Sequence, residues 1–119
     1  MHVYISGPVT SNPMCPDRET NKHAFRHAEH FINQMFPLAT VVNPLDVPPT
    51  CGAQECGEYD GHSWNCWLRG DLIAMLKCDT ILMLPGWIYS EGAKLELNVA
   101  RGLSFDEYHL IDGKLVSMI

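Results

Sequence analysis

Residues 79–102 read DTILMLPGWIYSEGAKLELNVARG and contain a strand, a turn and a helix in succession. The short apolar run at 80–84 lies between an aspartate and a Pro-Gly pair, which predicts a buried strand of a parallel sheet. From about Gly92 the apolar residues recur at helical spacing, and Gly102 is the expected stop of this helix. In open α/β sheets, ligands bind where the end of a strand meets the start of a helix. Residues 85–92 are therefore expected to border a binding crevice.

The remaining sequence alternates strand and helix signals around this unit. Apolar spacing predicts strands at 3–5 and 40–42, helices at 20–35 and 64–78, and a final hairpin of strands at 108–111 and 114–117 joined by Asp112-Gly113. This alternation predicts one domain over residues 1–119 with an α/β fold. We expect a Rossmann-like three-layer sandwich, in which helices cover both faces of a mostly parallel sheet of four or five strands. Gly7-Pro8 lacks the further glycines of the dinucleotide fingerprint, so an NAD-binding domain is not expected.

Composition and charge exclude several classes of partner. The 119 residues carry 8 basic and 14 acidic side chains, which gives a net charge of -6. Binding to a nucleic-acid polymer is not expected, because an acidic protein lacks long-range attraction to phosphates. No apolar run approaches the ~20 residues that a membrane helix needs. The start, MHVYISG, also lacks the basic and apolar regions of a signal peptide. We expect a cytoplasmic protein without a membrane partner.

Two stretches without periodicity are expected to be loops, at 9–16 and 45–63. The second is rich in Pro, Gly, Asp and Cys, and it is long for a loop in a small domain. Loops of this length are usually functional or disordered. We interpret residues 45–63 as a lid or as a flap that contacts a dimer partner.

Four residues in and after this second loop form the pattern C-x4-C-x5-H-x3-C: Cys51, Cys56, His62 and Cys66. These are ligand types that zinc prefers, but their spacing matches no common zinc module. The five cysteines of a chain in which we find no export signal are expected to be reduced. We therefore expect unligated thiols and a solvent-exposed histidine, with no metal and no cofactor. A zinc-stabilised interaction protein is the alternative.

Two motifs carry a resemblance to a known family. Y-I-S-G-P occupies residues 4–8, and L-P-G-W-x-x-S-x-G-A-x-x-E occupies residues 84–96. With these motifs the chain, from Val3 to about Leu103, resembles the nucleoside 2-deoxyribosyltransferase superfamily, which includes the deoxynucleoside 5'-monophosphate N-glycosidases. Within it the sequence is similar to a small branch common in phages and bacteria. The resemblance implies a nucleoside or nucleotide as small-molecule partner and self-association as at least a dimer, although the chain is shorter than the transferases.

The resemblance also implies roles for matching residues. Glu96 corresponds to the family's nucleophile on C1' of the 2-deoxyribose, and Asp71 to an aspartate that assists the nucleobase. Tyr4 corresponds to a tyrosine that orients the nucleophile through a hydrogen bond to its carboxylate. Ser90, with the backbone amides around Gly92 and Ala93, corresponds to the site that holds the 5' end of the nucleotide.

Reasoning from the residues themselves points to the same region. Glu96 lies about one turn into its helix, where the helix dipole is expected to keep the carboxylate ionised. Ser6 and Gly7 follow the first strand and are expected at the crevice, to contact the substrate. Trp87 is the expected stacking surface for a base, with a role in covering the core edge as the alternative.

The expected function is cleavage or transfer of the N-glycosidic bond of a 2-deoxyribonucleoside or its 5'-monophosphate, through a covalent glycosyl-Glu96 intermediate. Whether water or a second base resolves that intermediate decides between hydrolase and transferase, and the sequence leaves this open. A non-catalytic module that binds a nucleotide or a nucleotide-derived signal in the same crevice is the alternative function.

Overall fold

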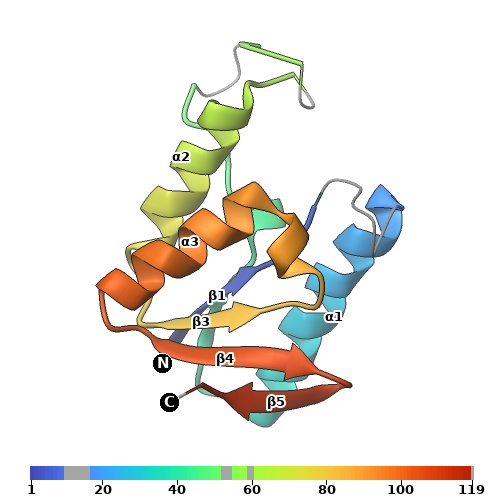
Figure 1. Cartoon of the computed structure of the whole chain (residues 1–119), viewed down its shortest axis with the longest axis vertical. Helices are drawn as coiled ribbons and strands as arrows, with labels where there is room; N and C mark the ends of the chain where they lie inside the picture. Colours follow the sequence, from blue (N-terminus) through green and yellow to red (C-terminus); the bar gives the residue numbers. More distant parts are fainter. Residues whose placement is uncertain (10–16, 52–54, 59–60, 119) are drawn as a thin grey trace.

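A computed structural model describes residues 1–9, 17–51, 55–58 and 61–118 (Figure 1). These residues form a compact α/β fold with a five-stranded sheet and three α-helices. In chain order the elements are β1 (His2–Ser6), α1 (Arg18–Met35), β2 (Thr40–Val42), the 3-10 turn η1 (Pro44–Asp46), α2 (Trp64–Met75), β3 (Thr80–Met83), the 3-10 turn η2 (Trp87–Tyr89), α3 (Glu91–Gly102), β4 (Asp106–Ile111) and β5 (Lys114–Ser117). The predicted loop at 9–16 falls almost wholly outside the described residues, and so do parts of the loop at 45–63.

The sheet is mostly parallel, as predicted. Its strand order is β2-β1-β3-β4-β5, in which the first four strands run parallel and β5 runs antiparallel to β4. The chain turns from β4 into β5 at Asp112 and Gly113, whose φ values are 51° and 75°. Two successive positive φ angles are the mark of a type I′ hairpin turn, which Asp-Gly favours.

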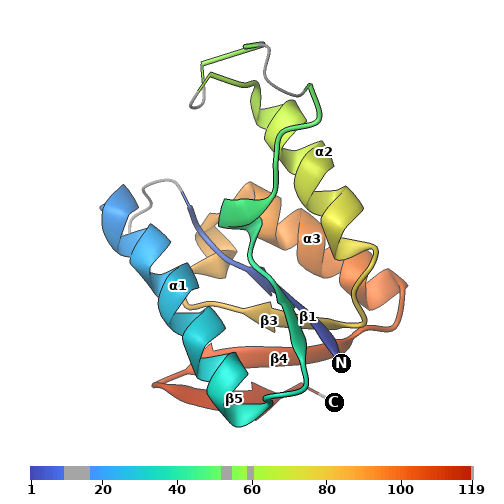
Figure 2. The same ribbon diagram turned by 180° about the vertical axis from the view of Figure 1, so that it is seen from behind.

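Both faces of the sheet are covered by helices (Figures 1 and 2). Side chains alternate along β1, so Val3 and Ile5 belong to the core under α1, whereas Tyr4 belongs to the core under α3. All four residues of β3 are buried, because a core lies on each face of the sheet at this strand. A strand buried on both faces has no polar side, which explains the continuous apolar run from which it was predicted.

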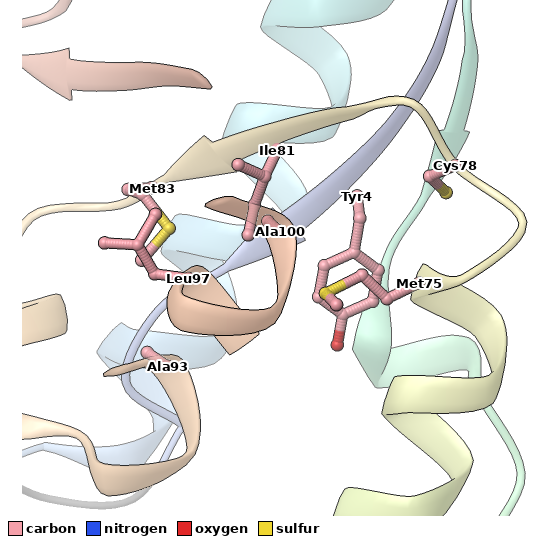
Figure 3. Close-up of a cluster of buried hydrophobic side chains, with 8 residues drawn as sticks. All are labelled: Tyr4, Met75, Cys78, Ile81, Met83, Ala93, Leu97 and Ala100. Carbon is pink, nitrogen blue, oxygen red and sulfur yellow. The ribbon is translucent and has the colours of Figure 1, made fainter. Parts of the chain in front are cut away.

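The core between the sheet and α3 also receives the end of α2 (Figure 3). Its buried members are Tyr4, Met75, Cys78, Ile81, Met83, Ala93, Leu97 and Ala100. In Figure 3 the ring of Tyr4 lies beside Met75 and its hydroxyl oxygen points away from the strand that carries it. The rest of α2 projects beyond the sheet, and the described residues 55–58 and 61–63 lie at its far end (Figure 1).

The helix ends show how local chemistry sets the boundaries. The helix predicted from residue 20 begins at Arg18, because the Asp17 side chain caps it by accepting from the Glu19 N–H. At α2 and α3 the capping residues are Ser63 and Ser90, whose hydroxyl oxygens accept from the N–H groups of Cys66 and Ala93. A capping residue lies outside the apolar pattern, so periodicity does not detect it. The predicted start of the helix was therefore about half a turn too far along the chain.

The predicted stop of α3 at Gly102 is confirmed, because Gly102 is the last helical residue. Gly102 is still helical, and the left-handed residue is Ser104 with φ 59°. The Ser104 N–H donates to the Arg101 carbonyl and the Phe105 N–H to the Ala100 carbonyl, which is the Schellman pattern. The turn into β4 therefore stops the helix, although no glycine occupies the left-handed position.

None of the described helices is long and apolar enough to cross a membrane.

Candidate active site

A cleft of about 440 Å³ opens where the carboxyl ends of β1 and β2 meet the starts of the helices. Its size lies within the roughly 300–1,000 Å³ typical of small-molecule sites. Its lining residues are Gly7, Val9, Arg18, Lys22, Pro44, Leu45, Trp64, Trp67, Leu68, Asp71, Tyr89, Ser90, Glu91, Gly92, Ala93 and Glu96. The cleft thus takes side chains from all three α-helices, at the edge of the sheet that the sequence indicated.

Glu96 reaches this cleft from the buried side of α3. Only 5% of the residue is exposed, and both carboxylate oxygens accept hydrogen bonds. The Tyr4 hydroxyl donates to Oε2 at 2.7 Å and the Ser6 hydroxyl donates to Oε1 at 2.6 Å. Because Tyr4 and Ser6 lie two apart on β1, they point to the same face of the sheet, toward α3. The predicted contact between Tyr4 and Glu96 is present.

The charge of Glu96 is less favoured than the helix dipole alone led us to expect. Burial raises the pKa of Glu96 to about 7, although the hydrogen bonds from Ser6 and Tyr4 oppose that rise. Desolvation therefore outweighs the two hydrogen-bond donors. The same burial, with Glu96 nearby, raises the pKa of Tyr4 well above its usual value, so Tyr4 remains a hydrogen-bond donor.

Asp71 faces the same cleft from α2 and is half-buried. Burial, followed by the charge of Glu96, raises the pKa of Asp71 to about 8. Asp71 is thus mostly protonated near neutral pH, while Glu96 is the first of the two to ionise. The cleft holds one carboxyl group that can donate a proton and one that can carry negative charge.

The start of α3 supplies a polar corner of the cleft. Ser90, Gly92 and Ala93 all line it, and the Ser90 oxygen accepts from the Ala93 N–H at 3.1 Å. Across the cleft, Gly7 follows β1 directly. An added Cβ at Gly7 would lie 2.8 Å from the Leu84 Cβ, so no larger residue fits there without displacing the backbone.

Two predicted substrate contacts lie elsewhere. Ser6 is fully buried and contacts Glu96 instead of lining the cleft. Trp87 is also not among the lining residues: it packs against the core under α3, and its ring meets His109 edge-on at 5.6 Å. This arrangement agrees with the alternative role of Trp87 in covering the core edge.

The chain was compared with models of known protein families. The domain of unknown function DUF4406 matches residues 1–106. The chain belongs to this family. No match was found among curated proteins or among solved structures. The matched residues contain the whole cleft of this DUF4406 domain, together with Tyr4 and Ser6.

Several cleft residues of the DUF4406 domain were not predicted from the sequence. Trp64, Trp67 and Leu68 lie in the segment where apolar spacing predicted the helix at 64–78, and helical periodicity does not distinguish a core-facing residue from one in a cleft wall. Arg18 and Lys22 come from the first turns of α1. Basic residues are unfavourable near a helix N-terminus, where the helix dipole is positive. The unusual position of these two basic side chains was the signal in the sequence that could have indicated a binding role.

The DUF4406 domain also brings its cysteine and histidine pattern together. One ligand atom from each of Cys51, Cys56, His62 and Cys66 lies within 4.8 Å of all the others. His62 is buried, and its ring packs edge-on against Trp67 at 4.9 Å. The expectation of a solvent-exposed histidine is therefore wrong.

Proposed function

We propose that this DUF4406 domain cleaves the N-glycosidic bond of a 2-deoxyribonucleoside or its 5'-monophosphate, with Glu96 as nucleophile. The arrangement of Glu96 carries the proposal: a buried carboxylate, oriented by the Tyr4 and Ser6 hydroxyls, at the wall of a nucleoside-sized cleft. Tyr4 and Ser6 belong to the first resemblance motif and Glu96 to the second, and these distant segments meet at one carboxylate. We also propose that the fold of this domain is the Rossmann-like three-layer sandwich of the nucleoside 2-deoxyribosyltransferase superfamily.

The chemistry follows from the two carboxyl groups. The Glu96 carboxylate attacks C1' and forms a C1'–O bond, while the C1'–N bond breaks and its electron pair goes to the base. Protonated Asp71 gives its proton to the departing base and is left as a carboxylate. Water then attacks C1', Glu96 leaves, and the proton from that water returns to Asp71. If a second base attacks instead of water, the same cycle is a deoxyribosyl transfer.

The rest of the cleft supplies a place for each part of the substrate. Trp64 and Trp67 offer aromatic surface for a base on the α2 side. Arg18 and Lys22 offer positive charge, and Ser90 stands at the N-terminal end of α3. A 5'-phosphate would be recognised by these groups through charge-assisted hydrogen bonds and the helix dipole.

The test is release of free base from a panel of 2-deoxyribonucleosides and their 5'-monophosphates, measured by chromatography. We expect release by the wild-type protein and a loss of roughly 10³-fold or more in Glu96→Gln, which keeps the shape of the side chain but cannot form the glycosyl ester. Adding a second free base to the reaction distinguishes the two outcomes of the intermediate. A new deoxyribonucleoside, or a new deoxyribonucleotide from a 5'-monophosphate, indicates transfer. Deoxyribose, or deoxyribose 5-phosphate from a 5'-monophosphate, as the sole sugar product indicates hydrolysis.

Glu58→Gln is the matched control, since Glu58 is exposed and does not line the cleft. Its rate of base release should equal that of the wild type. If Glu96→Gln is folded by circular dichroism and still releases base at the wild-type rate, the assignment of the nucleophile is wrong. Tight binding of a nucleotide by calorimetry without any turnover would instead identify a non-catalytic nucleotide-binding module.

A further inference from the structure

We propose that Cys51, Cys56, His62 and Cys66 bind one zinc ion, which fixes the outer end of α2. The proposal is independent of the reaction in the cleft, because none of the four ligands lines it. Three thiolates and one imidazole are the donor set of structural zinc sites, and a tetrahedral set of sulfur and nitrogen favours zinc among the common divalent metals.

The distances between the donor atoms are those of a coordination sphere. With zinc–sulfur bonds of about 2.3 Å, neighbouring ligand atoms at the corners of a tetrahedron lie about 3.8 Å apart. The Cys51 sulfur lies 3.5 Å from that of Cys56, 3.4 Å from that of Cys66 and 2.9 Å from His62 Nδ1. The Cys56 sulfur lies 3.8 Å from the same Nδ1. The four atoms therefore enclose a space of the right size for one ion.

The surroundings of the sulfurs suit thiolates. The Cys51 N–H points to the Cys66 sulfur at 3.4 Å, and the Ser63 N–H points to the Cys56 sulfur at 3.3 Å. The Thr50 hydroxyl also donates to the Cys66 sulfur, at 3.4 Å. Donors directed at metal-bound sulfur are the outer shell that orients ligands in zinc sites. The edge contact with Trp67 holds the His62 ring in place in the same way.

The backbone between the ligands is shaped to bring them together. The Cys56 N–H donates to the Gly61 carbonyl at 2.9 Å, and Gly61 has a φ of 85°. An added Cβ at Gly57 would lie 2.5 Å from the Ser63 nitrogen. Only glycine allows the chain after Cys56 to pack this closely on the segment that carries His62. The two glycines thus allow the close backbone approaches that bring Cys56 and His62 together.

This part of the molecule has little else to hold it together. Among the described residues, neither hydrophobic core has a member between Leu45 and Leu72, and α2 projects beyond the sheet (Figure 1). A buried histidine and a buried cysteine at such a projecting end need a source of order other than the core. A closed set of four protein ligands supplies one, and it leaves no position for a substrate, so the site is structural.

The site also bears on the cleft, because Cys66 is followed on α2 by the cleft residues Trp67, Leu68 and Asp71. Zinc bound at the start of α2 would fix the helix that carries this wall. Zinc removal should then lower the melting temperature of the whole protein, since the free energy of metal binding contributes to folding.

The first test is elemental analysis of protein produced with zinc and purified under reducing conditions, without a chelator and without a polyhistidine tag. We expect about one zinc per chain. Cobalt(II) added to the metal-free protein should give the thiolate-to-cobalt charge-transfer band and the visible bands of a tetrahedral site. Both readouts use the wild-type chain, so they do not depend on whether variants fold.

Variants then assign the ligands. Cys51→Ser and Cys66→Ser should each lower the zinc content to below about one tenth of an equivalent. Cys78→Ala is the matched control, because Cys78 is a free cysteine in the core under α3, outside the cluster, and this variant should keep its zinc. Wild-type protein without zinc and without the cobalt charge-transfer band would overturn the proposal. So would a Cys51–Cys56 disulfide, seen by mass spectrometry as the loss of two hydrogens, in protein kept under reducing conditions.

Discussion

Glu96 and Asp71 are two carboxyl groups in one cleft, but their surroundings give them different proton affinities. Glu96 accepts hydrogen bonds from Tyr4 and Ser6, which favour its charged form against the effect of burial. For Asp71, burial and the neighbouring charge of Glu96 act in the same direction. The difference separates a nucleophile from an acid, as the proposed reaction requires.

Removal of the Tyr4 hydroxyl should show whether Tyr4 orients the Glu96 carboxylate or only packs in the core. Tyr4→Phe keeps the ring in the core but removes one of the two donors to Glu96. We expect kcat for base release to fall about tenfold to a hundredfold with little change in KM, because the carboxylate is no longer fixed in its attack geometry. The ascending limb of the pH profile should also move to higher pH, since the lost hydrogen bond lowered the pKa of Glu96. An unmoved limb would mean that Tyr4 has only a packing role.

The pH dependence of base release should be bell-shaped. Glu96 must be ionised, so kcat/KM should rise through about pH 7, and Asp71 must be protonated, so kcat/KM should fall above about pH 8. The two apparent pKa values belong to the interacting pair. Asp71→Asn should reduce the rate and abolish the descending limb. A descending limb that persists in this variant would assign it to another group.

At the scale of the elements, the cleft is built from the ends of strands and the starts of helices. Ser6 ends β1 and contacts Glu96, and Ser90 caps α3 and lines the cleft. Apolar runs and turn residues placed these elements from the sequence. The cap at Asp17 and the left-handed turn at Ser104 were missed, because they depend on hydrogen bonds between particular backbone groups.

The end of α3 allows a stability test of the turn that follows the helix at Ser104. Gly102→Ala should stabilise the protein by about 0.5 kcal/mol, because Gly102 is helical and an added Cβ there meets no atom within 4 Å. Ser104→Gly should stabilise it by about 0.5–1 kcal/mol, by relieving the left-handed conformation of a residue with a side chain. Urea unfolding measures both. Destabilisation by Gly102→Ala would contradict the helical conformation of Gly102.

At the scale of the whole molecule, the cleft exists because three helices meet over the strand ends. Glu96 comes from α3, Asp71 from α2, and Arg18 with Lys22 from α1, so residues far apart in the sequence share one cleft. Two carboxyl groups held there cost folding free energy whenever both must be charged. The site should therefore be visible in the pH dependence of stability.

The free energy of unfolding should contain a component that falls as the pH rises from about 4 to 8. Asp71 has a raised pKa in the folded state, so in this range it stays protonated when folded and ionises when unfolded. The folded state thus binds the extra proton, and rising pH favours unfolding until about pH 8. Asp71→Asn lacks this component and should gain on the order of 2–4 kcal/mol relative to wild type between pH 5 and pH 8. Urea titrations at several pH values measure this difference. If the free energies of unfolding of the wild type and of Asp71→Asn change in parallel with pH, the pKa of Asp71 in the folded protein is not raised.

The sequence by itself determined the order of strands and helices, the mostly parallel sheet, the hairpin at Asp112 and Gly113, and the edge at which the cleft lies. These follow from local periodicity and turn chemistry, which act over a few residues. Only the tertiary structure decided that Trp87 packs into the core while Trp64 and Trp67 face the cleft. It alone gathered the four zinc-type ligands and raised the pKa values of Glu96 and Asp71. The physical reason is that burial and electrostatic environment depend on which segments meet in space, and local sequence patterns do not contain that information.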